Sequence, residues 1–144
     1  MVTTFKYKQI NNTCGLKHKP TIDLILQGRS KFSIKTAMLL DSGADVSVIP
    51  LDLAKLLDID LSMKESVTNG IGGEVKSKRT SMKVSIYLKE DHRLYTYTIP
   101  VEVILDDDPP PILGRDGFFD KFQITIIEAE EKIKLKKYSK KFKH

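Results

Sequence analysis

Apolar residues alternate with polar ones through the middle of the chain. From Ser81 to Leu88, positions 82, 84, 86 and 88 are Met, Val, Ile and Leu. This period of two predicts a strand with one buried face. A second long β segment is predicted over Leu94–Leu105. Because proline cannot donate a hydrogen bond to a sheet, Pro100 indicates an edge position or a bulge within that segment.

Three pairs of β-rich segments flank short turn sequences. Each pair predicts an antiparallel hairpin, because apolar and β-branched runs stand on both sides of residues typical of turns. The pairs are Thr21–Leu26 with Lys31–Leu40, Met63–Thr68 with Val75–Thr80 across the glycine-rich tip 69–73, and Gln123–Ala129 with Lys132–Tyr138. Strands therefore dominate the predicted structure.

The remaining segments predict two short helices and little other regular structure. Apolar positions over Leu51–Ile59 fit an amphipathic helix with Pro50 at its start, and Arg115–Phe122 indicates a second short helix. Val2–Ile10 is predicted to be an edge strand, and Asn11–Pro20 a turn-rich loop. The whole pattern predicts an all-β fold, a closed or nearly closed small barrel.

The 144 residues fit a single domain with one shared core. We expect an N-terminal extension or edge strand over 1–20, the main domain over 21–138, and a basic tail over 139–144. The first residues lack the continuous apolar stretch of a secretory signal. No apolar run approaches the roughly 20 residues needed to cross a bilayer, so no membrane span is expected.

The single cysteine, Cys14, excludes an intrachain disulfide, and a reducing cytoplasm is the natural setting for such a chain. We interpret Cys14 as an ordinary thiol, because no histidine–asparagine pattern accompanies it. His18, His92 and His144 lie far apart and lack the paired spacing of zinc ligands. No metal or other cofactor is expected.

The net charge of +5 is concentrated at one end of the chain. Residues 132–144 hold seven of the 24 basic side chains and no acidic one, which leaves 17 basic against 19 acidic elsewhere. Such a tail can bind nucleic acid or an anionic membrane surface, but a solvated, frayed end is the commoner interpretation. The body lacks a basic stripe with interleaved aromatic residues, which does not favour nucleic acid as the main partner.

The strongest chemical signal is Leu39–Asp45, with the sequence Leu-Leu-Asp-Ser-Gly-Ala-Asp. Asp-Ser-Gly alone is a common turn. Here an apolar strand precedes the triplet, and the largely apolar Val46–Pro50 follows it. A carboxylate in that setting is costly unless it is hydrogen-bonded or functional, so Asp41 is a candidate catalytic residue. Gly43 is expected to adopt backbone geometry that a larger residue would resist.

Three segments of the chain resemble segments of the retropepsins, which are the retroviral and retrotransposon aspartic proteases, and of their cellular relatives. The three occur in the same order along the chain as in that family. The sequence LLDSGADVSVIP at 39–50 resembles their active-site segment, and PILGRD at 111–116 resembles the apolar-apolar-Gly-Arg segment before their C-terminal helix. The glycine-rich tip 69–73 lies between the two, as the family's flap does. The resemblance covers roughly residues 20–128.

This resemblance implies a retropepsin-like acid protease barrel with one or two short helices, active as a C2 homodimer. In aspartic proteases two aspartates share a proton and activate the water that attacks a peptide bond. Asp41 matches the catalytic aspartate, and Asp-Ser/Thr-Gly occurs only once in the sequence. Each subunit would therefore contribute one Asp41 to a dyad across the dimer.

The resemblance also implies the residues around the dyad. Ser42 and Arg115 would support the active site. Arg115 would form an ion pair with Asp45, although two independent surface charges are the simpler alternative. An extended peptide or unfolded protein would bind between the cleft floor and the flap. The implied substrate-binding residues are Gly43, Ala44, Asp45, Gly70, Ile71, Gly72 and Gly73.

Other parts of the cleft allow two interpretations each. The segment DDDPPP at 106–111 cannot form regular structure, and it would either edge the cleft or form a rigid surface turn. Ile112–Leu113 after it is expected to be a short buried strand. The apolar candidates for pocket walls, each equally suited to the core, are Val48, Ile49, Ile71, Ile104 and Ile112.

Two functions from other classes compete with a peptidase. A non-catalytic peptide-binding or scaffold module could use the same fold, but it would have no need of a carboxylate at Asp41. Nucleic-acid binding through Lys132–His144 would weaken steeply with salt and would disappear when the tail is removed.

Overall fold

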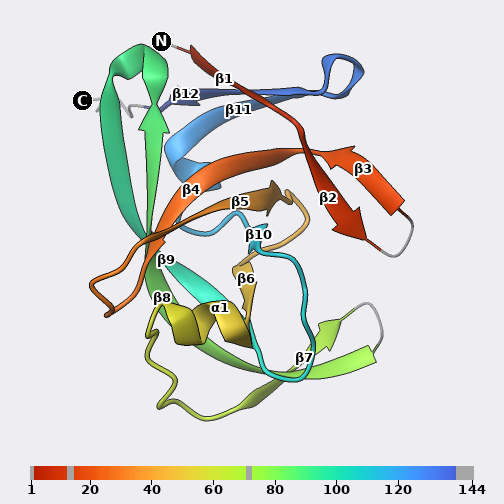
Figure 1. Cartoon of the computed structure of the whole chain (residues 1–144), viewed down its shortest axis with the longest axis vertical. Helices are drawn as coiled ribbons and strands as arrows, with labels where there is room; N and C mark the ends of the chain where they lie inside the picture. Colours follow the sequence, from red (N-terminus) through yellow and green to blue (C-terminus); the bar gives the residue numbers. More distant parts are fainter. Residues whose placement is uncertain (1, 13–14, 71–72, 139–144) are drawn as a thin grey trace, which may run out of the picture.

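The structure, a computed structural model, describes residues 2–12, 15–70 and 73–138 (Figure 1). Within these residues the chain forms twelve strands, one α-helix and three short 3-10 helices. Seven strands make one sheet, three make a second sheet, and two form a separate hairpin. The predicted all-β fold is confirmed.

The seven-stranded sheet closes into a barrel. Its strand order is β4-β5-β10-β6-β9-β8-β7, and an additional pairing of β4 with β8 joins its two sides. β7 lies outside the closed ring, as the partner of β8 in the lower part of Figure 1. The bounds are β4 Thr21–Gln27, β5 Ile34–Leu40, β6 Ser47–Pro50, β7 Ser66–Gly70, β8 Gly73–Leu88, β9 Arg93–Ile104 and β10 Ile112–Leu113.

The longest ladder joins β8 and β9. The two strands predicted over 75–80 and 81–88 are one continuous strand, β8, which pairs antiparallel with β9 from Ser77↔Ile104 to Leu88↔Arg93. Pro100 pairs with Ser81 of β8, while β6 begins to pair with β9 only at Val101. Among the described strands, Pro100 thus has a neighbour on one side only, which confirms the predicted edge position.

The alternation over β8 builds one wall of the barrel core. Met82, Val84, Ile86 and Leu88 are buried, and so are Ile99, Val101 and Val103 on β9. Burying one such side chain stabilises the fold by about 1.5–3 kcal/mol. The same core contains Ile22, Leu24 and Leu26 of β4, which shows that the ring of strands encloses a single apolar interior.

Helix α1 spans Leu51–Leu56, shorter than the Leu51–Ile59 predicted, with Pro50 as its N-cap. A left-handed residue, Asp58 (φ 53°), ends it. The N–H of Asp58 donates to the carbonyl of Lys55 (3.1 Å), and the N–H of Ile59 donates to that of Ala54 (3.0 Å). These two bonds form a Schellman cap with aspartate in the usual glycine position. In the described part of the chain, no helix is long and apolar enough to cross a membrane.

A three-stranded sheet lies at the top of Figure 1, with β12 between β1 and β11. The strands are β1 Val2–Lys6, β11 Phe122–Ile127 and β12 Lys132–Lys137. On β12, Ile133 and Leu135 are fully buried between the lysines. The interpretation of residues 132–144 as a frayed end is therefore wrong for 132–137, because the alternate apolar side chains anchor this segment. Residues 139–144 lie outside the described residues.

Two local predictions are wrong. The predicted loop Asn11–Pro20 lies largely in a hairpin of β2 (Lys8–Asn12) with β3 (Gly15–Lys19). The predicted helix Arg115–Phe122 contains only a 3-10 turn at Phe119–Lys121. A left-handed glycine inside it, Gly117 (φ 83°), breaks the helical path.

Candidate active site

Asp41 directly follows strand β5, and neighbouring segments fix its backbone. The N–H of Asp41 donates to the carbonyl of Leu113 on β10 (3.1 Å). The preceding N–H groups, of Leu39 and Leu40, donate to the carbonyls of Pro111 (2.9 Å) and Pro20 (2.8 Å). The position of Asp41 thus depends on β10, which is parallel to β5 in the register Leu113↔Leu40 and lies beside β6.

A tight turn follows Asp41 and orients its carboxylate. The N–H of Ala44 donates to the carbonyl of Asp41 (3.2 Å), and the N–H of Gly43 donates to its Oδ1 (2.9 Å). A charge-assisted bond of this kind holds the side chain in one orientation. The Asp41 side chain is half-buried, while Ser42 and Gly43 are exposed. The turn therefore presents a positioned carboxylate at the edge of solvent.

Gly43 has a different role from the one predicted. Its backbone does not lie in the left-handed region, so no special backbone geometry requires glycine. A Cβ at this position would instead lie 3.2 Å from Oδ1 of Asp41, which is closer than ordinary contact. Glycine here leaves space for the carboxylate.

The segment after β10 holds the turn from the other side. The N–H groups of Arg115 and Asp116 donate to the carbonyls of Ala44 (2.9 Å) and Asp45 (2.8 Å). The Arg115 guanidinium donates to the Asp45 carboxylate, so the structure contains the ion pair that the resemblance implied. The two side chains are 57% and 80% exposed, so the pair adds little stability and mainly orients the turn.

Gly114 lies where these two segments cross. A Cβ there would lie 2.6 Å from the carbonyl carbon of Val46 and 2.9 Å from the nitrogen of Ser47. The Gly114 N–H donates to Oγ of the fully buried Ser47 (2.9 Å). Only glycine permits this approach, which explains the glycine of the Ile-Leu-Gly-Arg segment in physical terms.

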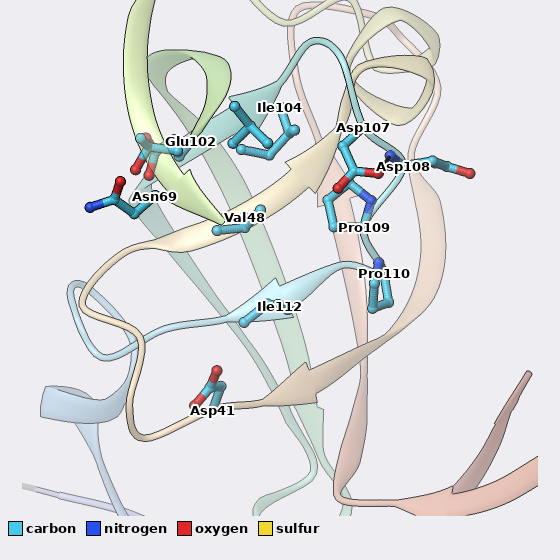
Figure 2. A pocket seen from close by; sticks show the side chains of 12 residues that line it. Asp41, Val48, Asn69, Glu102, Ile104, Asp107, Asp108, Pro109, Pro110 and Ile112 are labelled. Carbon is cyan, nitrogen blue, oxygen red and sulfur yellow. Dashed lines mark hydrogen bonds between the residues drawn. The ribbon is translucent and has the colours of Figure 1, made fainter. Parts of the chain in front are cut away.

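A cavity of about 550 Å³ opens beside Asp41 (Figure 2). Figure 2 shows Asp41 below Ile112, with Val48 and Ile104 beyond, Glu102 and Asn69 on one side, and Asp107 to Pro110 on the other. The volume suits a side chain or a short stretch of peptide. The lining residues are Asp41, Val48, Thr68, Asn69, Val75, Glu102, Ile104, Asp107, Asp108, Pro109, Pro110 and Ile112.

The β7–β8 hairpin forms one wall of the cavity through Thr68, Asn69 and Val75. Gly70 and Gly73 make the last described pair at its tip, and Gly73 has a left-handed backbone (φ 119°). Ile71 and Gly72, predicted to bind substrate, lie outside the described residues. The hairpin is tied to the opposite wall at its base, because the N–H of Lys76 donates to Oδ1 of Asp106 (2.9 Å).

The structure brings together some of the predicted cleft residues and separates others. Val48, Ile104 and Ile112 line the cavity, and so does the loop 106–111 through Asp107 to Pro110. Ile49 is fully buried in the core, so its interpretation as a pocket wall is wrong. Gly43, Ala44 and Asp45 form the turn beside Asp41 without lining this cavity.

Four lining residues were not among the predicted site residues: Thr68, Asn69, Val75 and Glu102. The first three lie together through the register of the β7–β8 hairpin, in which Thr68 pairs with Val75 and Asn69 with Glu74. Glu102 could have been identified from the sequence as a candidate site residue, since it is the single acidic residue within the apolar run Val101–Ile104. Its Oε1 accepts a hydrogen bond from Oγ of the buried Ser77 (2.8 Å).

A family model described as retroviral aspartyl protease matches residues 16–127, which is well over half of the chain. The chain belongs to the retroviral aspartyl protease family. The resemblance inferred from the three sequence segments is thereby confirmed.

Solved structures of retroviral-type aspartyl proteases also match this chain. A retropepsin-like aspartic protease from Rickettsia conorii matches with a TM-score of 0.62 and 17% identity, over 94% of this chain and 98% of that one. The EIAV protease in complex with the inhibitor HBY-793 matches with a TM-score of 0.49 and 24% identity, over 69% of this chain and 84% of that one. The Rickettsia structure confirms the retropepsin-like fold. A comparison with curated proteins finds no match to this sequence.

Proposed function

We propose that the protein is an aspartic endopeptidase whose active site forms between two copies of the chain. The observation that carries the proposal is the carboxylate of Asp41, held by the N–H of Gly43 at the edge of a large cavity in a retropepsin-like fold. The β7–β8 hairpin would act as the flap over an extended peptide substrate.

The proposed reaction needs two carboxylates in different protonation states. The ionised Asp41 takes a proton from a water molecule, and the water oxygen attacks the carbonyl carbon of the scissile bond. The protonated Asp41 of the other copy gives its proton to the carbonyl oxygen, which yields a tetrahedral diol. The first carboxyl group then gives its proton to the amide nitrogen, the other carboxylate takes a proton from a diol hydroxyl, and the C–N bond breaks. The two carboxylates again share one proton, as at the start.

Dimerisation follows from the number of suitable carboxylates. Asp-Ser-Gly at 41–43 has no second copy in the sequence. Asp116, which also stands beside a glycine but lacks the Asp-Ser-Gly context, is exposed on the segment that braces the turn. A C2 dimer would place two copies of the same turn face to face at its axis. Ser42, which is exposed beside Asp41, is suited to support that contact through its hydroxyl.

The first test replaces Asp41 with asparagine. We expect Asp41→Asn to lower cleavage of a denatured protein mixture by about 10³-fold or more, because the variant loses the acid–base pair. The matched control is Asp52→Asn, which neutralises an exposed carboxylate in the first turn of α1 and should keep full activity. Analytical ultracentrifugation should show the same dimer for all three proteins.

A mixing experiment tests the shared site. Wild type is equilibrated with an equal amount of Asp41→Asn, so that subunits exchange at random. The fraction of dimers with two intact carboxylates then falls from one half to one quarter, and total activity should be half that of the same amount of wild type alone. Unchanged activity in the mixture, or full activity of Asp41→Asn alone, would refute a dyad. Binding of extended peptides without any cleavage would instead support the non-catalytic module.

A further inference from the structure

We propose that the cavity beside Asp41 selects substrates with a lysine or arginine side chain near the scissile bond, with Glu102 and Asp107 as the residues that determine this specificity. The inference rests on the proposed peptidase function and adds the substrate class.

The cavity combines an apolar strip with acidic sides. Val48, Ile104 and Ile112 form the strip above Asp41 in Figure 2, with Glu102 on one side and Asp107 on the other. The lining contains four carboxylates, those of Asp41, Glu102, Asp107 and Asp108, and no basic side chain. A cavity lined by one sign of charge concentrates ligands of the opposite sign.

Lysine and arginine fit this arrangement as whole side chains. Their aliphatic stems pack on apolar surface, and their charged heads reach toward polar groups at the rim. A purely apolar side chain would fill the strip but would leave the carboxylates without a counterion. An acidic side chain would meet charges of the same sign.

The acidic side chains are held in place before substrate arrives. Glu102 is half-buried and accepts a hydrogen bond from Oγ of Ser77, which is itself 1% exposed (2.8 Å). Oδ1 of Asp107 accepts the N–H of Asp108 (2.8 Å), and the three prolines that follow limit backbone motion of the loop. Pre-positioned charges lose less side-chain entropy when a cation binds.

The spacing of these carboxylates favours an elongated cation over a metal ion. In the described part of the chain, the histidine, cysteine and acidic side chains make no group of three that could hold a metal ion. The charges are spread around the cavity instead of converging on one point. A side chain that lies along the apolar strip can approach the charges on either side of it.

One cation of the protein itself could compete. Arg79 lies opposite Glu102 in the β8–β9 ladder, on the same face of the sheet. It is exposed, it does not line the cavity, and its guanidinium makes no ion pair within 4.0 Å among the described residues. Arg79 should therefore weaken the preference for a basic substrate without abolishing it.

The test begins with a peptide library that maps cleavage sites by mass spectrometry. Once the preferred position is known, paired peptides place lysine or norleucine there, so that the pair differs in charge and shares the aliphatic stem. We expect kcat/KM to be about fivefold higher for lysine, as for a partly exposed ion pair, and the ratio to fall toward one at high salt.

Three variants then change the ratio in known directions. Glu102→Gln keeps an acceptor for Ser77 and should lower the lysine preference, as should Asp107→Asn. Arg79→Gln should raise it. The control is Glu90→Gln, which removes the same charge at the far end of the β8–β9 hairpin and should leave the ratio unchanged. Since Asp107 is exposed, Asp107→Asn remains informative if Glu102→Gln fails to fold.

Failure of this inference differs from failure of the proposed function. Cleavage with equal kcat/KM for both peptides, or a ratio that none of the three variants changes, would refute the basic specificity and leave the peptidase intact. If no peptide is cleaved, the proposed peptidase function fails. The preference of the cavity for a basic side chain is then tested by measuring peptide binding. Fluorescence anisotropy on Asp41→Asn, with labelled extended peptides that carry lysine or norleucine at one matched position, should show about fivefold tighter binding of the lysine peptide, and equal binding would refute the basic specificity.

Discussion

Substitution of Gly114 by alanine tests the crossing that positions Asp41. The new Cβ would lie 2.6 Å from the carbonyl carbon of Val46, whereas ordinary contacts begin at 3.4 Å, so the two segments must separate by roughly 0.8 Å. Such overpacking costs about 1–3 kcal/mol, and strain on the buried bond from Gly114 N–H to Ser47 adds about 1 kcal/mol. For a chain of this size we therefore expect the Tm to fall by about 10 °C.

The comparison variant is Gly43→Ala. Its Cβ would touch only Oδ1 of Asp41, at 3.2 Å, and a side-chain carboxylate on an exposed turn can shift by a few tenths of an ångström. We expect a change of less than about 0.5 kcal/mol in the free energy of unfolding. Activity should still fall about tenfold, because the carboxylate proposed to react is displaced.

Urea titrations and thermal scans measure stability, and kcat/KM on a cleavable peptide measures activity. Gly114→Ala should lose both, and Gly43→Ala should lose activity alone. A Gly114→Ala protein that unfolds within about 2 °C of wild type would show that the crossing of residues 114 and 46–47 is not tightly packed and does not hold the Asp41 turn in place.

Three further predictions concern the fold. Asp58→Gly should raise the free energy of unfolding by about 0.5–1 kcal/mol, because glycine suits the left-handed cap position; a lower urea midpoint would contradict this. Burial, and then the hydrogen bond to Glu128, raise the pKa of Tyr7 to about 12. Because its pKa is raised, Tyr7 contributes stability that is complete below pH 10 and lost as the pH rises toward 12. The stability difference between wild type and Tyr7→Phe should therefore shrink between pH 10 and 12 in urea titrations. Removal of residues 132–144 should unfold the protein, because β12 is the central strand of its sheet; a 1–131 fragment that keeps the circular dichroism spectrum of a folded protein would refute that role.

The sequence predicted the parts of the fold where side-chain pattern and burial coincide. The alternation at 82, 84, 86 and 88 located β8 because one face of that strand meets the core. The apolar residues before Asp41 located the end of β5 for the same reason. Glycine at 114 and the Asp45–Arg115 pair could be interpreted only through a resemblance, and the structure supplies the contacts that explain them.

Other parts could not be predicted, because they lack an apolar pattern or depend on residues distant in the chain. The β2–β3 hairpin consists mainly of polar residues and carries no apolar alternation. The segment 115–122 has apolar spacing that suits a helix, but Gly117 adopts a left-handed backbone, and a Cβ there would lie 3.0 Å from the Ile99 side chain of β9. Glu102 became part of the cavity only through its register with Val48 on β6.

The insertion of β10 beside β5 also has a consequence for the order of folding. The turn at Asp41 is fixed by the carbonyl of Leu113 and by the N–H groups of Arg115 and Asp116, about seventy residues later in the chain. β1 likewise finds its described strand partner only in β12. Contacts so distant in sequence form slowly, because a long loop must close before they stabilise anything. Asp41 of a growing polypeptide would therefore leave the ribosome before the residues that hydrogen-bond to its turn exist. The carboxylate would reach its position in the folded protein only after the Ile-Leu-Gly-Arg segment had been synthesised.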